Sequence, residues 1–196
     1  MAAREYRSFK EALADPEGVR RIYIVGATSR TLIPDMRQFV ALEELTIMGK
    51  LEHVTRFPDL SACTQLRRLT VTGTGVTKIA PGLGELSRLE ELHLVGHRKL
   101  KALPDDLVAL GKLKSLYVDN NRLASLPARI GELRSLHTLV AYNNALRELP
   151  ASLYRLPKLR WLELQCNRLA RPPVGLRKMK QLRHLQTDFP EIDAGG

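Results

Sequence analysis

Seven prolines are spaced almost evenly along this chain of 196 residues. The first interval is 24 residues and the next five are 23 residues each, for Pro34, Pro58, Pro81, Pro104, Pro127, Pro150 and Pro173. A period of this size indicates an array of small units that bury their apolar faces only by stacking on one another. The spacing therefore predicts one continuous solenoid, not two independent globular domains.

The amino-acid sequence between the prolines repeats as well. Residues 113–123, 136–146 and 159–169 each follow L-x-x-L-x-L-x-x-N-x-L, with Val118 or Ala141 in place of one Leu. This pattern resembles the leucine-rich repeat family, and the 23-residue period resembles its short bacterial type.

The same register extends upstream and downstream and predicts eight repeats within residues 19–187. They start near Val19, Leu42, Leu66, Leu89, Leu113, Leu136, Leu159 and Leu182, and those at Leu42 and Leu89 hold one extra residue. Residues 1–18 are expected to form an N-terminal capping helix, because Ser8 and Glu11 fit a capping box. Residues 188–196 are expected to form a short C-terminal cap or tail.

Alternation inside each unit predicts the fold class. In L-x-L, two side chains point to one face of a short strand and the intervening ones to the other. We expect an α/β solenoid, and the resemblance implies a right-handed superhelix with a parallel β-sheet on its concave face. Short 3₁₀ or helical turns should lie on the convex face, and Pro suits the start of such a turn.

The family's Asn lies inside and bonds free backbone groups at the corner that follows each strand. Asn121, Asn144 and Asn167 match this position, whereas Ala27, Lys50, Thr74 and His97 stand there upstream. We expect Thr74 to substitute for Asn. Lys50 and His97 should not, so irregular corners are expected at both.

No catalytic motif is present: there is no nucleophile elbow, no phosphate-binding loop and no zinc-binding helix pattern. His93 and His97 should point in opposite directions, one on a strand and one at a corner. Cys63 is expected in the core and Cys166 as an exposed thiol, too far apart to form a disulfide. We expect no enzyme activity, no cofactor and no metal.

Charges alternate in sign from one expected strand to the next in the first four repeats. The pairs are Arg20-Arg21, Glu43-Glu44, Arg67-Arg68 and Glu90-Glu91. Opposite charges on neighbouring strands attract, which favours a self-compensating ladder. A charged recognition strip is the alternative.

Beyond that ladder the outward positions change character. Aromatic anchors with polar neighbours are typical of protein-binding surfaces. The candidate partner-binding residues over repeats five to seven are Tyr117, Asp119, Tyr142, Trp161, Glu163 and Gln165. The alternative is that Trp161 lies flat on Tyr142 and Arg160 and only shields the sheet.

The net charge of +10 is concentrated near the C-terminus, where residues 155–183 hold nine Lys or Arg and only Glu163 as an acid. The densest basic patch is Arg177, Lys178, Lys180 and Arg183. It raises an alternative function, binding of nucleic acid or anionic surfaces. No aromatic residues alternate with these cations to stack bases, so a solvated flank is favoured over nucleic acid.

These observations predict a monomeric, non-enzymatic protein-protein interaction module whose partner lies in the concave face. By resemblance, small bacterial repeat proteins of this kind include effectors acting in host cells and the recognition parts of such effectors. No apolar run is long enough to span a membrane, and no apolar stretch follows the N-terminal charges. We therefore expect the chain to be cytoplasmic, or exported without a cleavable secretory signal peptide.

Overall fold

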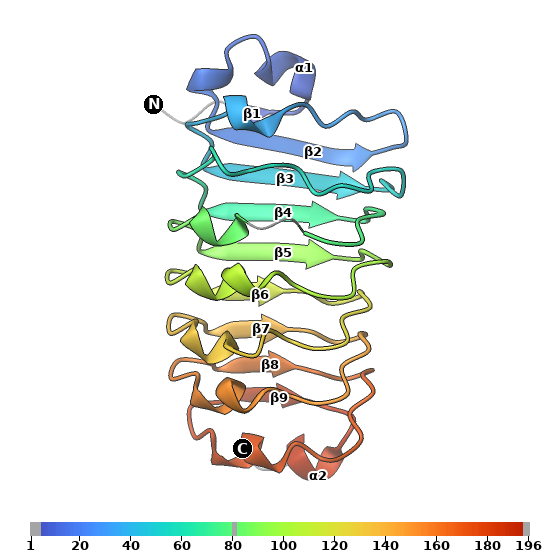
Figure 1. Ribbon diagram of the computed structural model, residues 1–196, viewed down its shortest axis with the longest axis vertical. Helices are drawn as coiled ribbons and strands as arrows, with labels where there is room; N and C mark the ends of the chain where they lie inside the picture. The colour runs from blue at the N-terminus through green and yellow to red at the C-terminus, as the bar shows by residue number, and fades with distance from the viewer. Residues whose placement is uncertain (1–4, 80–81, 194–196) are drawn as a thin grey trace.

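The chain forms one elongated stack of coils with its two ends at opposite poles (Figure 1). The structure, a computed structural model, describes residues 5–79 and 82–193. Pro81, the first four residues of the expected cap and the last three of the expected tail lie outside the described residues.

Within the described residues, a single parallel sheet of nine strands runs the length of the molecule, with strand order equal to chain order. The strands are β1 (Glu5–Tyr6), β2 (Arg21–Ala27), β3 (Glu44–Gly49), β4 (Arg68–Thr72), β5 (Glu91–Val95), β6 (Ser115–Tyr117), β7 (Thr138–Val140), β8 (Trp161–Glu163) and β9 (His184–Gln186). Neighbouring strands pair with equivalent repeat positions opposite each other, as in Leu92 with Leu116 and Leu139 with Leu162. The predicted solenoid with a parallel sheet is confirmed.

Strand β1 was not predicted. Its residues Glu5 and Tyr6 pair with Arg21 and Ile22 of β2, so the sheet begins before the first repeat. The helix that follows, α1 (Phe9–Ala12), is shorter than the helix-forming run suggested. Its capping residue is Ser8, whose hydroxyl accepts a hydrogen bond from the Glu11 amide at 3.2 Å.

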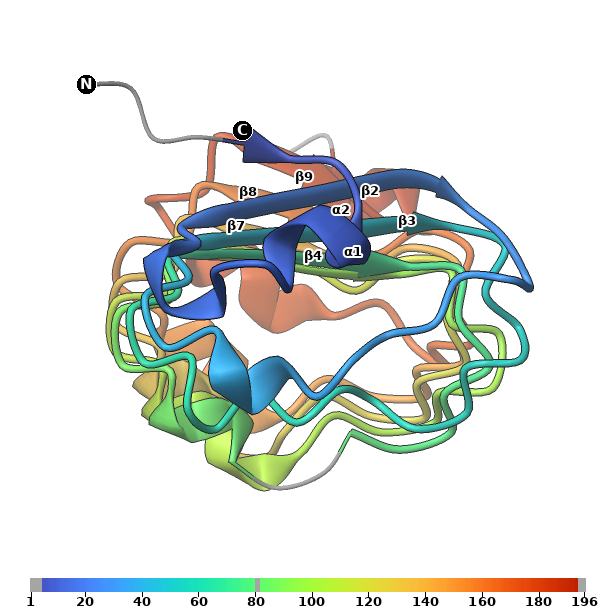
Figure 2. The same ribbon diagram turned by 90° about the horizontal axis from the view of Figure 1, so that it is seen from above.

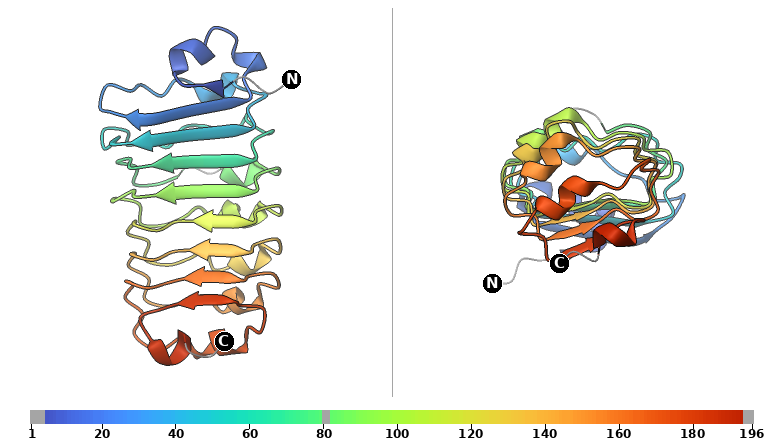
Figure 3. Two further views of the ribbon diagram at one scale, coloured as in Figure 1. Left: turned by 180° about the vertical axis from the view of Figure 1, so that it is seen from behind. Right: turned by 90° about the horizontal axis from the view of Figure 1, so that it is seen from below.

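Turns of 3₁₀ helix return the chain on the side opposite the sheet (Figures 2 and 3). They are Pro16–Gly18, Met36–Gln38, Leu83–Glu85, Asp105–Ala109, Ile130–Glu132, Ala151–Arg155 and Val174–Lys178. Pro104, Pro150 and Pro173 each immediately precede one of these turns, where a missing N–H costs nothing. We call this the convex face, and the exposed side of the sheet the concave face.

The core is one continuous column of apolar side chains between sheet and turns. Cys63 belongs to it as expected: it is fully buried, and burial raises the pKa of its thiol to about 11. At the C-terminal end, α2 (Pro190–Asp193) places Ile192 over the last coil with 2% of its surface exposed. The Asp188 carboxylate accepts hydrogen bonds from the amides of Cys166 and Asn167 at 2.8 and 3.1 Å.

The buried amides act as expected at the corners after β6, β7 and β8. Asn121 donates to the carbonyls of Leu94 and Val118, both at 2.7 Å, and accepts from the His97 amide at 2.7 Å. Asn144 and Asn167 donate to the equivalent carbonyls one and two coils further on, but they accept from the amides of Leu123 and Leu146. Each amide thus ties two coils together.

The expectation for His97 was wrong. It fills the Asn position with 1% of its surface exposed, and its Nδ1 lies 2.6 Å from the Thr74 hydroxyl. Lys50 does not occupy the position at all. Ile47 pairs with Val71 and Leu51 with Thr74, so four residues stand opposite three, and the extra residue of this repeat puts Leu51 where Lys50 was expected. The corner near Lys50 is therefore irregular, as expected.

Candidate functional site

The left view of Figure 3 shows the concave face of the sheet from the front. The strand register places three rows of side chains on this face. The amino-terminal row includes Glu91, Ser115, Thr138, Trp161 and His184. The middle row includes His93, Tyr117, Val140, Glu163 and Gln186. Two residues further along each strand or corner, the carboxyl-terminal row includes Val95, Asp119, Tyr142 and Gln165.

The upstream charges of this face pair with one another. Arg68 lies 3.2 Å from Glu44 and 3.3 Å from Glu91, and these two carboxylates raise the pKa of its guanidinium. Glu90 lies 2.6 Å from Lys114 and 3.5 Å from Arg67, and hydrogen bonding to Lys114 lowers the pKa of its carboxyl. The alternating charges of the sequence thus form the self-compensating ladder.

Tyr117 lies at the centre of the downstream surface. Its ring stacks on His93 with centroids 4.2 Å apart and planes 14° apart. Burial raises the pKa of the Tyr117 hydroxyl, and the carboxylates of Glu91, Glu163 and Asp119 raise it further. His93 is not among the residues expected in the site, although aligning the repeats places it at the outward position next to Tyr117.

Asp119 differs from the expectation of an exposed side chain, because only 5% of its surface is accessible. Its carboxylate accepts a hydrogen bond from the Asn120 side-chain amide at 2.6 Å. The same amide donates to the Tyr142 hydroxyl at 3.2 Å. Asp119 and Tyr142 are therefore held together through Asn120, with Tyr142 the outer member.

Trp161 is the most exposed of the candidate residues at 42%. Its ring stacks on His184, with centroids 3.6 Å apart and planes 16° apart. The indole N–H donates to Glu163 Oε1 at 2.7 Å. Its ring partner is thus His184, not Tyr142 as the shielding alternative held.

The six candidate residues are spread over all three rows of β6, β7 and β8 and the corners after them. Tyr117 and Trp161 are two strands apart, roughly 10 Å. Tyr142 lies in the opposite row from Trp161, so the three aromatic rings are spread over the face and do not form one contiguous strip. Gln165 lies beside Tyr142 in the carboxyl-terminal row, and its side-chain amide donates a hydrogen bond to Gln186 Oε1 at 3.0 Å.

The carboxylates of the concave face over β6 to β8 have fewer cationic partners than those over β2 to β5. Within the described residues neither Asp119 nor Glu163 pairs with a Lys or Arg; Glu163 has only His184, at 3.6 Å. The concave face over β6 to β8 therefore combines aromatic rings with two carboxylates whose charge no cation offsets.

The basic patch lies elsewhere. Arg177 and Lys178 end the last 3₁₀ turn, Lys180 follows them, and Arg183 stands where the chain enters β9; all four are exposed. The structure does not bring them onto the aromatic surface.

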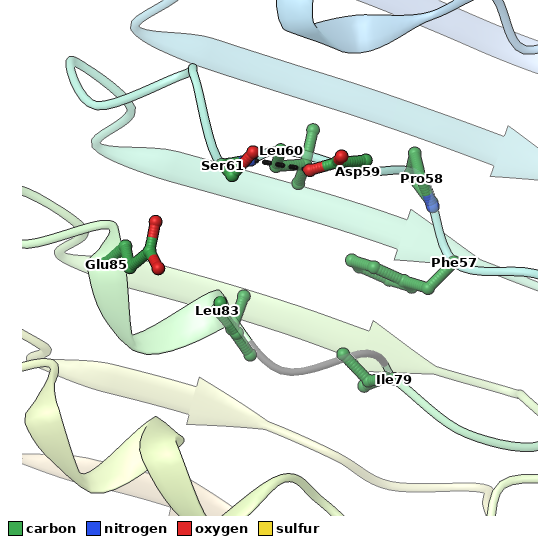
Figure 4. A pocket seen from close by; sticks show the side chains of 9 residues that line it. Phe57, Pro58, Asp59, Leu60, Ser61, Ile79, Leu83 and Glu85 are labelled. Carbon is green, nitrogen blue, oxygen red and sulfur yellow. Dashed lines mark hydrogen bonds between the residues drawn. The ribbon is translucent and has the colours of Figure 1, made fainter.

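A pocket of about 370 Å³ opens on the convex side, where Phe57, Ile79 and Leu83 point into the same space (Figure 4). Its one hydrogen-bonded acid, Asp59, accepts from the Ser61 amide at 3.0 Å. This lining offers no nucleophile paired with a base. In residues 5–79 and 82–193, no three His, Cys, Asp or Glu side chains gather closely enough to hold a metal ion.

Comparisons with known proteins agree with this geometry. The family model described as Leucine rich repeat matches residues 111–169, the segment that carries the buried Asn residues. A leucine-rich repeat protein of Leptospira interrogans superposes with a TM-score of 0.83 over 94% of this chain at 26% identity. The chain has the leucine-rich repeat fold.

Two further leucine-rich repeat structures share the fold. An internalin from Listeria monocytogenes has a TM-score of 0.67 over 90% of this chain at 20% identity. The leucine-rich repeat domain of the type III effector XopL has a TM-score of 0.66 over 83% of this chain and 70% of that domain, at 23% identity. No curated protein sequence matches the chain.

The chain spans 47% of the Leptospira protein and 49% of the internalin. Leucine-rich repeat domains generally serve as protein-interaction scaffolds and not as enzymes. None of the helices in the described part of the chain is long and apolar enough to cross a bilayer.

Proposed function

We propose that this protein is a non-enzymatic protein-interaction module whose partner lies on the concave face over β6, β7 and β8. The observation that carries the proposal is Trp161, which remains 42% exposed beside a carboxylate that no Lys or Arg offsets. Upstream strands of the same sheet neutralise their charges internally. Downstream, the equivalent surface is left for a partner.

Fixed aromatic rings suit this role. Trp161 is held by His184 and Glu163, and Tyr117 is held by His93. Side chains that are already ordered lose little conformational entropy on binding. Trp and Tyr are also the residue types that most often dominate binding energy at protein interfaces.

The charge of the surface indicates the chemistry of the partner. Glu163 and the buried Asp119 give a local negative potential in a chain with a net charge of +10. A partner that places Lys, Arg or amide donors over Tyr117 and Tyr142 would be complementary. Gln165 adds a neutral hydrogen-bonding group at the carboxyl-terminal edge of the site.

The likeness to a type III effector domain supports a bacterial effector, or the recognition part of one, as the biological setting. Such a protein would act in the cytoplasm, or be exported without a cleavable secretory signal peptide. Because the chain spans about half of the first relatives, any activity of a longer protein would come from other segments.

Affinity capture with paired variants tests the proposal. Trp161→Ala and Tyr142→Ala remove side chains that contribute little to the core, so the melting temperature should change little. Both should lose a partner that the wild type retains. Val174→Ala, which truncates a side chain 63% exposed on the convex side, is the matched control and should retain it. Retention by all three variants would contradict the proposed site.

A further inference from the structure

A groove of about 1000 Å³ runs along the corners that follow the carboxyl ends of the strands. These strand ends lie on the right-hand side of Figure 1. Its lining comes from the corners that follow β3, β4, β5, β6 and β7, from Gly49 at one end to Asn143 at the other. Four strand spacings make it roughly 19 Å long. It borders the aromatic surface described above, because Asn120 lines the groove and also bonds Asp119 and Tyr142.

Backbone packing explains why the groove is hollow. A Cβ atom at Gly49, Gly73 or Gly75 would come within about 2 Å of a carbonyl oxygen on the neighbouring coil. These corners therefore accept only glycine. The glycines are required by stacking, and as a result the floor of the groove carries few side chains.

Cations line the groove. Lys50, Arg98, Lys99 and Arg122 are all exposed members of its lining, and the only acid among the lining residues is Glu52. None of the four cations forms an ion pair within the described part of the chain, in contrast to Arg68 and Lys114 on the concave face. The coils bring them together: the Arg122 amide donates to the Leu100 carbonyl of the preceding coil at 3.0 Å.

We propose that this groove binds a chain of phosphate groups, as carried by the backbone of a nucleic acid or by inorganic polyphosphate. The cations are spaced by one or two strands, about 5 to 10 Å, so they can contact successive charges of a linear ligand. Arginine presents paired donors that match phosphate oxygens.

The lining also disfavours other ligands. No aromatic residue lines the groove, so bases would not be stacked and any nucleic acid would be bound without regard to sequence. Val95 is the one large apolar side chain in the lining, which leaves an acidic peptide without pockets for its side chains. The basic patch at Arg177, Lys178, Lys180 and Arg183 is separate, and this proposal does not use it.

Fluorescence anisotropy with a short labelled oligothymidylate tests the proposal, with inorganic polyphosphate as competitor. The groove variant is Arg98→Gln, Lys99→Gln and Arg122→Gln combined. Its matched control is Lys178→Gln, Lys180→Gln and Arg183→Gln combined, which removes the same charge from exposed positions elsewhere. The groove variant should bind at least about 10-fold more weakly, and the slope of log affinity against log salt should fall by about 2. The control should stay within about 2-fold of the wild type.

Several results would overturn the proposal. They are no binding by the wild type at low salt, no loss in the groove variant, or an equal loss in both variants, since the last would reflect net charge alone. Competition by polyglutamate as effective as that by polyphosphate would also overturn it, because the groove would then not select phosphate. Competition by polyphosphate at lower concentration than unlabelled oligothymidylate identifies the free polymer as the source; the reverse identifies nucleic acid. Trp161→Ala should leave this binding unchanged, so the test is independent of the concave-face proposal.

Discussion

At the scale of single residues, one backbone position distinguishes the corners of this solenoid. The residue just before the position of the buried Asn has a positive φ in six coils. These residues are Gly26, Gly73, Gly96, Asn120, Asn143 and Cys166. Glycine and asparagine tolerate this left-handed conformation, whereas other residues are strained in it. This explains the Asn-Asn pairs of the sequence, where the first Asn turns the chain and the second is buried.

Cys166 is the exception in that series, with a φ of 57°. Replacing Cys166 with Asn should therefore raise the free energy of unfolding by about 0.5 to 1 kcal/mol. Urea denaturation measures the change. Cys166→Ser removes the thiol but keeps the strain, so it should give no gain; equal stabilisation by both variants would show that the thiol, not the backbone, is responsible.

His97 gives the protein a pH-dependent stability. Burial lowers the pKa of its imidazole from 6.5 to about 4. Between these values the unfolded chain binds a proton that the folded chain does not, so the free energy of unfolding falls as the pH drops from about 6.5 towards 4. The loss should reach about 3 kcal/mol.

The variant His97→Asn isolates this effect. It installs the residue that fills the same position in the next three coils, and it has no group that titrates in this range. Burial also lowers the pKa of His93, which remains in the variant, so only the difference between the two curves reports on His97. Denaturation curves of wild type and variant should converge or cross as the pH falls; curves that stay parallel between pH 6.5 and 4 would contradict the assignment.

At the scale of strands and turns, the concave ladder sets the charge of the upstream face but adds little stability. Its members are partly exposed, and exposed ion pairs contribute at most about 1 kcal/mol. Glu90→Lys places a third cation beside Arg67 and Lys114 and should lower the free energy of unfolding by about 1 kcal/mol or less.

The salt dependence of the Glu90→Lys destabilisation shows whether its cause is electrostatic. The cost of Glu90→Lys, measured by thermal or urea denaturation, should shrink as ionic strength rises because salt screens exposed charges. A cost that is unchanged in high salt would mean that Glu90 acts through packing.

The repeats themselves could be predicted from the sequence because one apolar pattern specifies strand, turn and stacking together. The parallel strands and the outward position of Trp161 follow from that pattern. Strand β1 could not be predicted, since Glu5 and Tyr6 carry no repeat signal and pair only because the first repeat offers an open sheet edge. The role of His97 does not follow from the pattern, because its imidazole can fill the Asn position only with the Thr74 hydroxyl of the preceding coil beside it.

Side-chain partners were predicted less well than positions. The register places Trp161 outward, but its stacking on His184 depends on rotamers that a repeat pattern does not specify. Likewise Asp119 occupies an outward position and is nevertheless buried. The groove at the sheet edge combines corners of five coils, and its cations are not adjacent in the sequence.

At the scale of the whole molecule, the solenoid separates its surfaces by charge. The upstream concave face is internally neutralised, the downstream concave face is aromatic and acidic, and the strand-end edge is basic. A rod with such surfaces can engage different ligands on different sides without a conformational change.

Site-specific photo-crosslinking of the captured partner tests the concave-face account most directly. A photoreactive residue is introduced at Tyr117 on the concave face, and separately at Lys178 on the convex side. The account predicts an abundant crosslink from the Tyr117 position that is lost when Trp161→Ala is added, and little or none from the Lys178 position. Efficient crosslinking from Lys178 with none from Tyr117 would contradict it.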